Sequence, residues 1–134
     1  MHGIIKRLFL ELDAKTLIWP GHEYTLPNLE FASILEPNNA ALKVRLMNAK
    51  VSRSKEESTV PSTWKYELMT NPFLRIDSRT RDGELWVNIM KYAPSLVLES
   101  TPQSIHIGNE RRKDTEEIII LDCLRSIKDS WKAK

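Results

Sequence analysis

The sequence has 134 residues, which suits one small domain or a part of a larger protein. Its formal net charge is only +2, which argues against a strong, sequence-independent hold on nucleic acid. No apolar run approaches the roughly 18 residues of a membrane-spanning helix. The single cysteine, Cys123, has no partner for an internal disulfide and favours a reducing compartment. We therefore expect no nucleic-acid partner and no membrane segment, and a cytoplasmic location with the mitochondrion as the alternative.

The chain begins with a pattern typical of a helix and continues into a short strand. Ile4, Leu8 and Leu12 recur at helical spacing. The β-branched and aromatic run Lys15–Trp19 predicts a buried strand, which Pro20-Gly21 ends. We expect this strand to be the one short strand of a mainly helical structure.

Two helices are predicted next. Thr25 is placed to cap the first helix, whose apolar side extends to Leu35. Asn38-Asn39 predicts a turn and a cap for the second helix, from Ala40 to about Lys55. The apolar stripe of this second helix consists of Leu42, Leu46 and Ala49.

The remainder of the chain has two clear helical segments separated by an unclear region. Trp64–Met69 predicts a short helix that ends at Asn71-Pro72, because the residue before a proline avoids the helical region. Between Ile76 and Lys113 the periodicity is lost, and strand and loop are both open. A final helix is predicted with its cap at Asp114. Its apolar face carries Ile120, Cys123, Leu124, Ile127 and Trp131.

Five side chains are candidates for chemistry, and each also has a structural explanation. His22 follows the strand and the Pro-Gly turn, so it is either a metal ligand or general base, or a polar turn residue. Tyr24 either donates to a ligand or packs at the surface. Arg125 and Lys128 lie one helical turn apart, which suits the binding of a carboxylate or phosphate, or a solvated basic face. Cys123 lies on the apolar face, where a core thiol is expected.

Several uncommon sequence words occur in an order that is typical of one enzyme family. They are Pro20-Gly21-His22-Glu23-Tyr24-Thr25-Leu26, Glu36-Pro37-Asn38-Asn39, Val60-Pro61-Ser62-Thr63, Asn71-Pro72-Phe73-Leu74-Arg75 and, near the end, Arg125, Lys128 and Asp129. In these words the sequence closely resembles the glyoxalase II family, the hydroxyacylglutathione hydrolases of the metallo-β-lactamase superfamily. The resemblance covers about residues 4–76 and 114–134. It implies hydrolysis of the thioester S-(R)-lactoylglutathione to glutathione and D-lactate, in methylglyoxal detoxification.

The resemblance also implies roles for single residues. His22 looks like the last histidine ligand of the family's binuclear site, which would hold zinc, iron or manganese. Tyr24 looks like the tyrosine that reaches glutathione, and Arg125 and Lys128 look like the basic pair that holds its carboxylate. These residue types suit the chemistry, because a thioester carbonyl needs a Lewis acid and a metal-bound hydroxide. A tripeptide with free carboxylates needs fixed cations.

One departure from the family pattern shapes the predicted organisation. The main metal loop of the family, Thr-His-X-His-X-Asp-His, occurs nowhere in this sequence. The chain therefore looks like the C-terminal half of such an enzyme. We expect residues 1–25 to end a metallo-β-lactamase-like αββα domain. Residues 26–134 would form the helical C-terminal domain, with an insertion at about 77–113. The predicted fold class is mainly α, with the last short strand of that sandwich.

Functions of different classes stay open. The first is a glyoxalase II-type thioester hydrolase, of which this part alone is inactive and retains little metal, because one histidine cannot hold a binuclear site. The second is a non-catalytic helical module that binds glutathione or a partner protein. Turnover assayed with added zinc or iron would separate these two. A nucleic-acid-binding helix is a third hypothesis, which the near-zero net charge argues against. The oligomeric state is not predicted.

Overall fold

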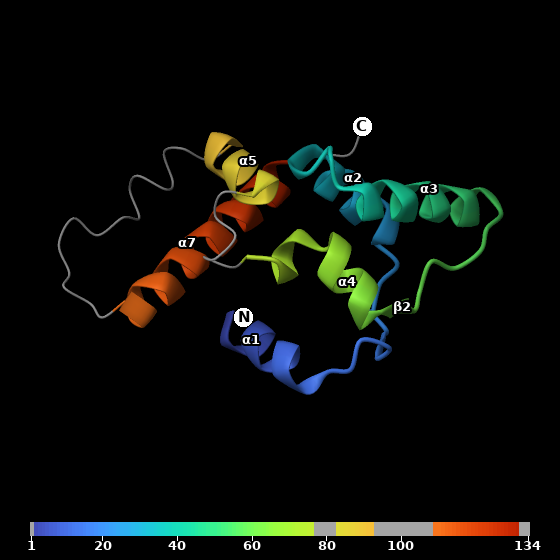
Figure 1. Cartoon of the computed structure of the whole chain (residues 1–134). Helices are drawn as coiled ribbons and strands as arrows, with labels where there is room; N and C mark the ends of the chain where they lie inside the picture. Colours follow the sequence, from blue (N-terminus) through green and yellow to red (C-terminus); the bar gives the residue numbers. More distant parts are fainter. Residues whose placement is uncertain (1, 77–82, 93–108, 132–134) are drawn as a thin grey trace. The chain divides into compact units, whose positions relative to one another are not determined.

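The computed structural model describes residues 2–76, 83–92 and 109–131, and over these residues the chain is mainly helical, as predicted (Figure 1). The chain divides into two compact units, one over Gly3–Arg75 and one over Ile76–Lys132. In chain order the elements are α1 (His2–Glu11), β1 (Leu17–Ile18), α2 (Thr25–Leu35), α3 (Ala40–Ser54), β2 (Ser62–Thr63), α4 (Trp64–Thr70), the 3₁₀ helix η1 (Pro72–Leu74), α5 (Glu84–Tyr92) and α7 (Asn109–Ser130).

A small antiparallel ladder joins two distant parts of the first unit. The predicted strand forms as β1 over two residues only, and the expectation that it is buried is wrong, because Leu17 is 53% exposed. It pairs with β2, Leu17 opposite Thr63 and Ile18 opposite Ser62. The ladder continues where the Trp64 amide donates to the Thr16 carbonyl at 2.8 Å. The sequence did not predict β2, because Val60-Pro61-Ser62-Thr63 has the composition of a chain break. Two residues gain extended structure there because a strand is available to pair with them.

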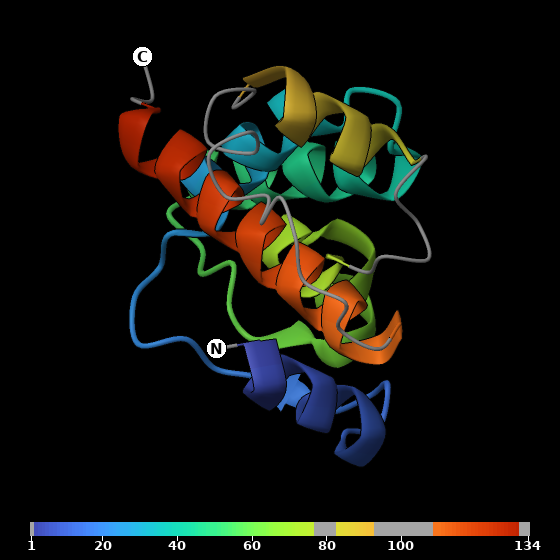
Figure 2. The same cartoon turned by 90° about the vertical axis from the view of Figure 1, so that its left-hand side faces the viewer.

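A hairpin of two helices forms the core of the first unit. Asn39 caps α3, since its side chain accepts a hydrogen bond from the Leu42 amide at 3.0 Å, as predicted. The predicted stripe of α3 is also confirmed, because it packs on α2, which lies beside it in both views (Figures 1 and 2). The core residues are Leu29, Ala32, Leu42 and Ala49, with Leu26 and Leu46 packed against them.

The start of α2 differs from the prediction. Thr25 is the first helical residue and not the cap. Tyr24 occupies the cap position, and its side chain makes no capping hydrogen bond. The Asn28 amide bonds directly to the Tyr24 carbonyl at 3.0 Å. The helix therefore begins one residue earlier than the Thr25 hydroxyl suggested, and Tyr24 lies at the junction of loop and helix.

Polar contacts fix the end of the first unit. Thr63 caps α4 by accepting a hydrogen bond from the Tyr66 amide at 3.3 Å. The helix stops before Pro72, as predicted, and the Asn71 side chain accepts a bond from the Phe73 amide at 3.1 Å. Further along, the buried carboxylate of Glu36 forms an ion pair with Arg75. The two caps fix the ends of α4 and η1, and the Glu36–Arg75 pair ties the end of this segment to the helical hairpin.

The second unit contains α5 packed on α7. The expectation of strand or loop between Ile76 and Lys113 is wrong over Glu84–Tyr92 and over residues 109–113, which are helical. The rest of that stretch up to residue 108 lies largely outside the described residues. In α5 the buried residues are Leu85, Trp86 and Ile89. Their i, i+1, i+4 spacing is helical, but in so short a segment it is hard to distinguish from a strand.

The final helix begins earlier than predicted. α7 starts at Asn109, so Asp114 lies inside the helix and is not its cap. The predicted apolar face is otherwise confirmed, because Ile120, Cys123 and Leu124 are buried. Ile127 and Trp131 are half-buried. The capping-box pattern at Asp114 was misleading, since acidic residues are also favourable within the first turns of a helix.

Candidate functional site

The first unit contains a cavity of about 390 Å³ beside the loop that follows β1. Residues from α2, α3, α4 and η1 form its other walls. Its apolar lining consists of Ile18, Leu29, Phe31, Val60, Pro72 and Phe73. Its polar lining includes His22, Tyr24, Asn28, Arg45, Ser62, Glu67, Thr70 and Asn71. An apolar wall with a few convergent polar groups is the composition expected of a small-molecule site.

Two of the predicted site residues meet at this cavity. The rings of His22 and Tyr24 are stacked, with centroids 5.1 Å apart and an interplanar angle of 18°. Both side chains are exposed, Tyr24 by 59%. An imidazole and a phenol are thus presented together at the cavity, in reach of a ligand.

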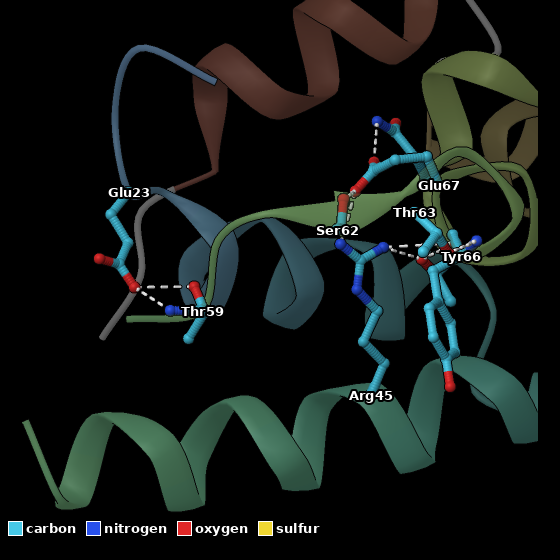
Figure 3. A network of polar contacts seen from close by, with 9 residues as sticks. Glu23, Arg45, Thr59, Ser62, Thr63, Tyr66 and Glu67 are labelled. Atoms are coloured by element: carbon cyan, nitrogen blue, oxygen red, sulfur yellow. Dashed lines mark hydrogen bonds and ion pairs between the residues drawn. The ribbon is translucent and has the colours of Figure 1, made fainter. Parts of the chain in front are cut away.

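Glu23, which lies between His22 and Tyr24 in sequence, is hydrogen-bonded to a segment far along the chain. The Glu23 carboxylate accepts hydrogen bonds from the amide and the hydroxyl of Thr59, at 2.6 and 2.8 Å (Figure 3). An Arg53 guanidinium nitrogen lies 3.6 Å from the same oxygen. The two bonds from Thr59, followed by the charge of Arg53, lower the pKa of Glu23. No local sequence pattern singles out Glu23, because its partner Thr59 lies 36 residues further along the chain.

A second carboxylate lies in a polar network at the wall of the cavity. Oε1 of Glu67 is 2.5 Å from Nη2 of Arg45 and 2.5 Å from the Ser62 hydroxyl, which donates to it (Figure 3). The side-chain Nδ2 of Asn71 donates to the other carboxylate oxygen at 3.1 Å. Burial acts to raise the pKa of Glu67, but the bonds from Ser62 and Arg45, the charge of Arg45 and the bond from Asn71 outweigh it and lower the pKa. Glu67 is therefore held ionised.

Both terminal nitrogens of the Arg45 guanidinium donate hydrogen bonds. Nη1 donates to the Thr70 hydroxyl at 2.5 Å and to the Tyr66 carbonyl at 3.3 Å, while Nη2 faces Glu67. From sequence, Arg45 is one of several cations on the polar side of α3. A periodicity argument places it on that side, but it cannot reveal a partner on another helix.

The predicted basic pair lies in the second unit, on α7. Arg125 is exposed, and Lys128 is half-buried with its Nζ 4.6 Å from the centre of the Trp131 ring. Partial burial lowers the pKa of Lys128. The role of this pair in holding a glutathione carboxylate stays a prediction from the resemblance. Cys123 is buried as expected, and burial followed by the charge of Asp122 raises the pKa of its thiol.

A metal site at His22 would need further ligand side chains close to it. Over the described ranges of the chain, no group of three or more His, Cys, Asp or Glu side chains is placed to hold a metal ion. His22 thus offers one imidazole, which does not fit a binuclear centre without other ligands. Likewise, within residues 2–76, 83–92 and 109–131, no helix is long and apolar enough to cross a membrane.

Comparison with known proteins identifies the family. A family model described as "Hydroxyacylglutathione hydrolase C-terminus" matches residues 23–131. The match begins at Glu23, directly after His22, and includes Tyr24, the helical hairpin and α7. Because it covers most of the sequence, the chain belongs to the hydroxyacylglutathione hydrolase C-terminal family. The resemblance stated from sequence is confirmed.

Curated relatives carry the same name. A "Hydroxyacylglutathione hydrolase" of Gloeobacter violaceus is 54% identical over 69 residues, which cover 52% of this chain and 27% of the relative. One of Pseudomonas aeruginosa is 45% identical over 80 residues, covering 60% and 31%. A "Hydroxyacylglutathione hydrolase cytoplasmic" of Arabidopsis thaliana is 47% identical over 66 residues, covering 49% and 26%. In each comparison the matched part is about a quarter to a third of the relative's length.

Proposed function

We propose that this chain holds the glutathione part of a thioester substrate, as the C-terminal part of a hydroxyacylglutathione hydrolase. The substrate would be S-(R)-lactoylglutathione, which the complete enzyme would hydrolyse to glutathione and D-lactate. The observation that carries the proposal is the stacked pair His22 and Tyr24 at a cavity, in a chain of this family. The names of the relatives support the substrate class.

Each site residue has a distinct part in this proposal. The Tyr24 phenol donates a hydrogen bond to glutathione at the cavity, and the ring of His22 fixes the orientation of that phenol by stacking. Arg125 and Lys128 pair with a glutathione carboxylate, because two cations one helical turn apart can grip one anion. His22 would also contribute one ligand to a zinc, iron or manganese centre whose other ligands this sequence does not contain. The chain alone is therefore expected to bind without turnover.

Calorimetric titration of the 134-residue chain with glutathione tests this proposal. Saturable binding is expected, and Arg125→Ala or Lys128→Ala should weaken it by about ten-fold, since a bond between charged groups contributes about 1.5–3 kcal/mol. Tyr24→Phe keeps the ring and loses only the phenol, so it should weaken binding by about three-fold to ten-fold. Lys91→Ala, an exposed cation on α5, is the matched control and should leave the affinity unchanged.

Two results would contradict the proposal. The first is the absence of saturable binding to the wild-type chain. The second is an equal effect of Arg125→Ala, Lys128→Ala and Lys91→Ala, which would show a solvated basic surface and no specific carboxylate site. Turnover by the chain with added zinc or iron would show instead that this part is catalytically complete.

A further inference from the structure

We propose that Glu23 is a positioning residue, which sets the orientation of His22 and Tyr24 at the cavity by fastening their loop to Thr59. This inference rests on the proposed function, in which those two rings meet the ligand. Glu23 itself is given no contact with the substrate.

The loop has few other attachments at this point. Among the described residues, no backbone hydrogen bond ties Pro20–Glu23 to another segment of the unit. The first backbone bond after it is the one from the Asn28 amide to the Tyr24 carbonyl, which already belongs to α2. The side chain of Glu23 therefore supplies the link between the loop and the rest of the unit, with two short hydrogen bonds to Thr59.

The link uses two donors of Thr59 and a single acceptor oxygen of Glu23. Oε1 of Glu23 accepts from both the amide and the hydroxyl of Thr59, so the carboxylate is held by two donors on one residue. Arg53, at the end of α3, places its charge 3.6 Å away. Figure 3 shows the Glu23 carboxylate directed at Thr59. Glu23 lies between His22 and Tyr24 in sequence. Holding its side chain at Thr59 therefore limits the backbone conformations of the loop that carries the two rings.

Thr59 is a suitable anchor because its own segment is fixed. Val60 donates its amide to the Ser58 hydroxyl at 3.2 Å, and that hydroxyl donates to the Val60 carbonyl at 3.1 Å. Further along, the Ser62 hydroxyl donates to Glu67, and Ser62 pairs with β1. The segment Ser58–Ser62 thus connects the Glu67 network to the loop of the two rings. Two of its residues, Val60 and Ser62, also line the cavity.

Four variants of the full 134-residue chain separate positioning from simple stabilisation. Glu23→Ala removes the acceptor, and Glu23→Gln keeps an acceptor oxygen without the charge. Thr59→Val removes one donor at nearly constant shape, and Thr59→Ser keeps both donors. The matched control is Glu30→Gln, because Glu30 on α2 likewise pairs with a cation of α3, Lys50, at 3.8 Å, and makes no contact with Thr59.

Two measurements are made on each variant: the nuclear Overhauser effect between the rings of His22 and Tyr24, and the affinity for glutathione. We expect Glu23→Ala to abolish the ring contact and to weaken binding by about ten-fold, since hydrogen bonds to a charged group are lost. Glu23→Gln and Thr59→Val should weaken it by about three-fold. Thr59→Ser and Glu30→Gln should match the wild type in both measurements.

Persistence of the ring contact in Glu23→Ala at wild-type affinity would overturn the inference. If Glu23→Ala does not fold, the comparison of Thr59→Val with Thr59→Ser decides in its place, and equal ring contacts in these two would overturn it. If the wild-type chain does not bind glutathione, the proposed function fails on its own. The ring contact then still decides whether Glu23 positions His22 and Tyr24.

Discussion

Arg45 on α3 and Glu67 on α4 form an ion pair with 2.5 Å between Nη2 and Oε1, and each side chain is only 15% exposed. Their helices belong to different parts of the sequence, so this pair holds α4 against the helical hairpin. Removing one partner leaves the other charge poorly hydrated and unpaired, which costs more than the loss of a surface ion pair. The pair is therefore a specific test of how the first unit is held together.

Replacing Glu67 by alanine should destabilise the chain by about 2–4 kcal/mol, because Arg45, Ser62 and Asn71 all lose their acceptor. The free energy of unfolding is measured by urea denaturation followed by circular dichroism. Glu30→Gln, which removes an exposed ion pair with Lys50, is the control and should change it by less than about 1 kcal/mol. Equal losses of unfolding free energy in Glu67→Ala and Glu30→Gln would show that the Arg45–Glu67 pair does not hold α4 against the hairpin.

The stability of the chain should fall in acid because of Glu67. Its pKa in the folded state lies below the ordinary value of 4.5, so the unfolded chain takes up its proton first as the pH falls. The contribution of Glu67 is thus complete above pH 4.5 and is lost as the pH drops through the lowered folded-state value. We expect the stability difference between wild type and Glu67→Gln to shrink between pH 5 and pH 3. A difference that stays constant over this range would contradict the assignment.

The core of the helical hairpin gives a test that is independent of charge. Leu42 is fully buried, whereas Val44 on the same helix is 56% exposed. Leu42→Ala should cost about 2–5 kcal/mol through lost burial and a remaining cavity. Val44→Ala should cost less than about 0.5 kcal/mol. Thermal and urea denaturation of both variants check this, and similar losses would mean that α3 packs through another face.

The parts of the fold that were predicted correctly depend on neighbours in sequence. The cap at Asn39 acts three residues away, and the stripe with Leu42 and Ala49 repeats along one helix. Such signals can be found in a single sequence, because helical geometry fixes which residues share a face. Position after the strand made His22 a candidate but left a polar turn residue open, and the resemblance of the surrounding sequence words to a family favoured the functional role.

The parts that were missed depend on partners far along the chain. Ser62 joins a strand only because β1 is present to pair with it. Glu23 and Thr59 are 36 residues apart, and Arg45 and Glu67 are 22 apart. No local pattern shows that such residues will meet, because the fold of the intervening chain decides it. The roles of Arg125 and Lys128 in holding glutathione likewise remain predictions from the resemblance.

The isolated chain should retain little metal. His22 offers one imidazole at the cavity, and a single side chain gives too weak a site to survive dialysis. Elemental analysis after incubation with zinc or iron and exhaustive dialysis should find far less than one metal ion per chain, equally in wild type and in His22→Ala. A stoichiometric metal ion that His22→Ala abolishes would show that this chain forms a metal site by itself.

The most direct test of glutathione binding is a titration of the isotope-labelled 134-residue chain with glutathione, followed residue by residue by nuclear magnetic resonance. If this chain holds glutathione as proposed, His22 and Tyr24 in the first unit should show saturable shifts, and Arg125 and Lys128 in the second unit should show them too. The amide signals of Met47 and Val51, on the exposed side of α3, should stay unchanged. Shifts confined to one unit, or no saturable shift at all, would contradict the claim that this chain holds glutathione.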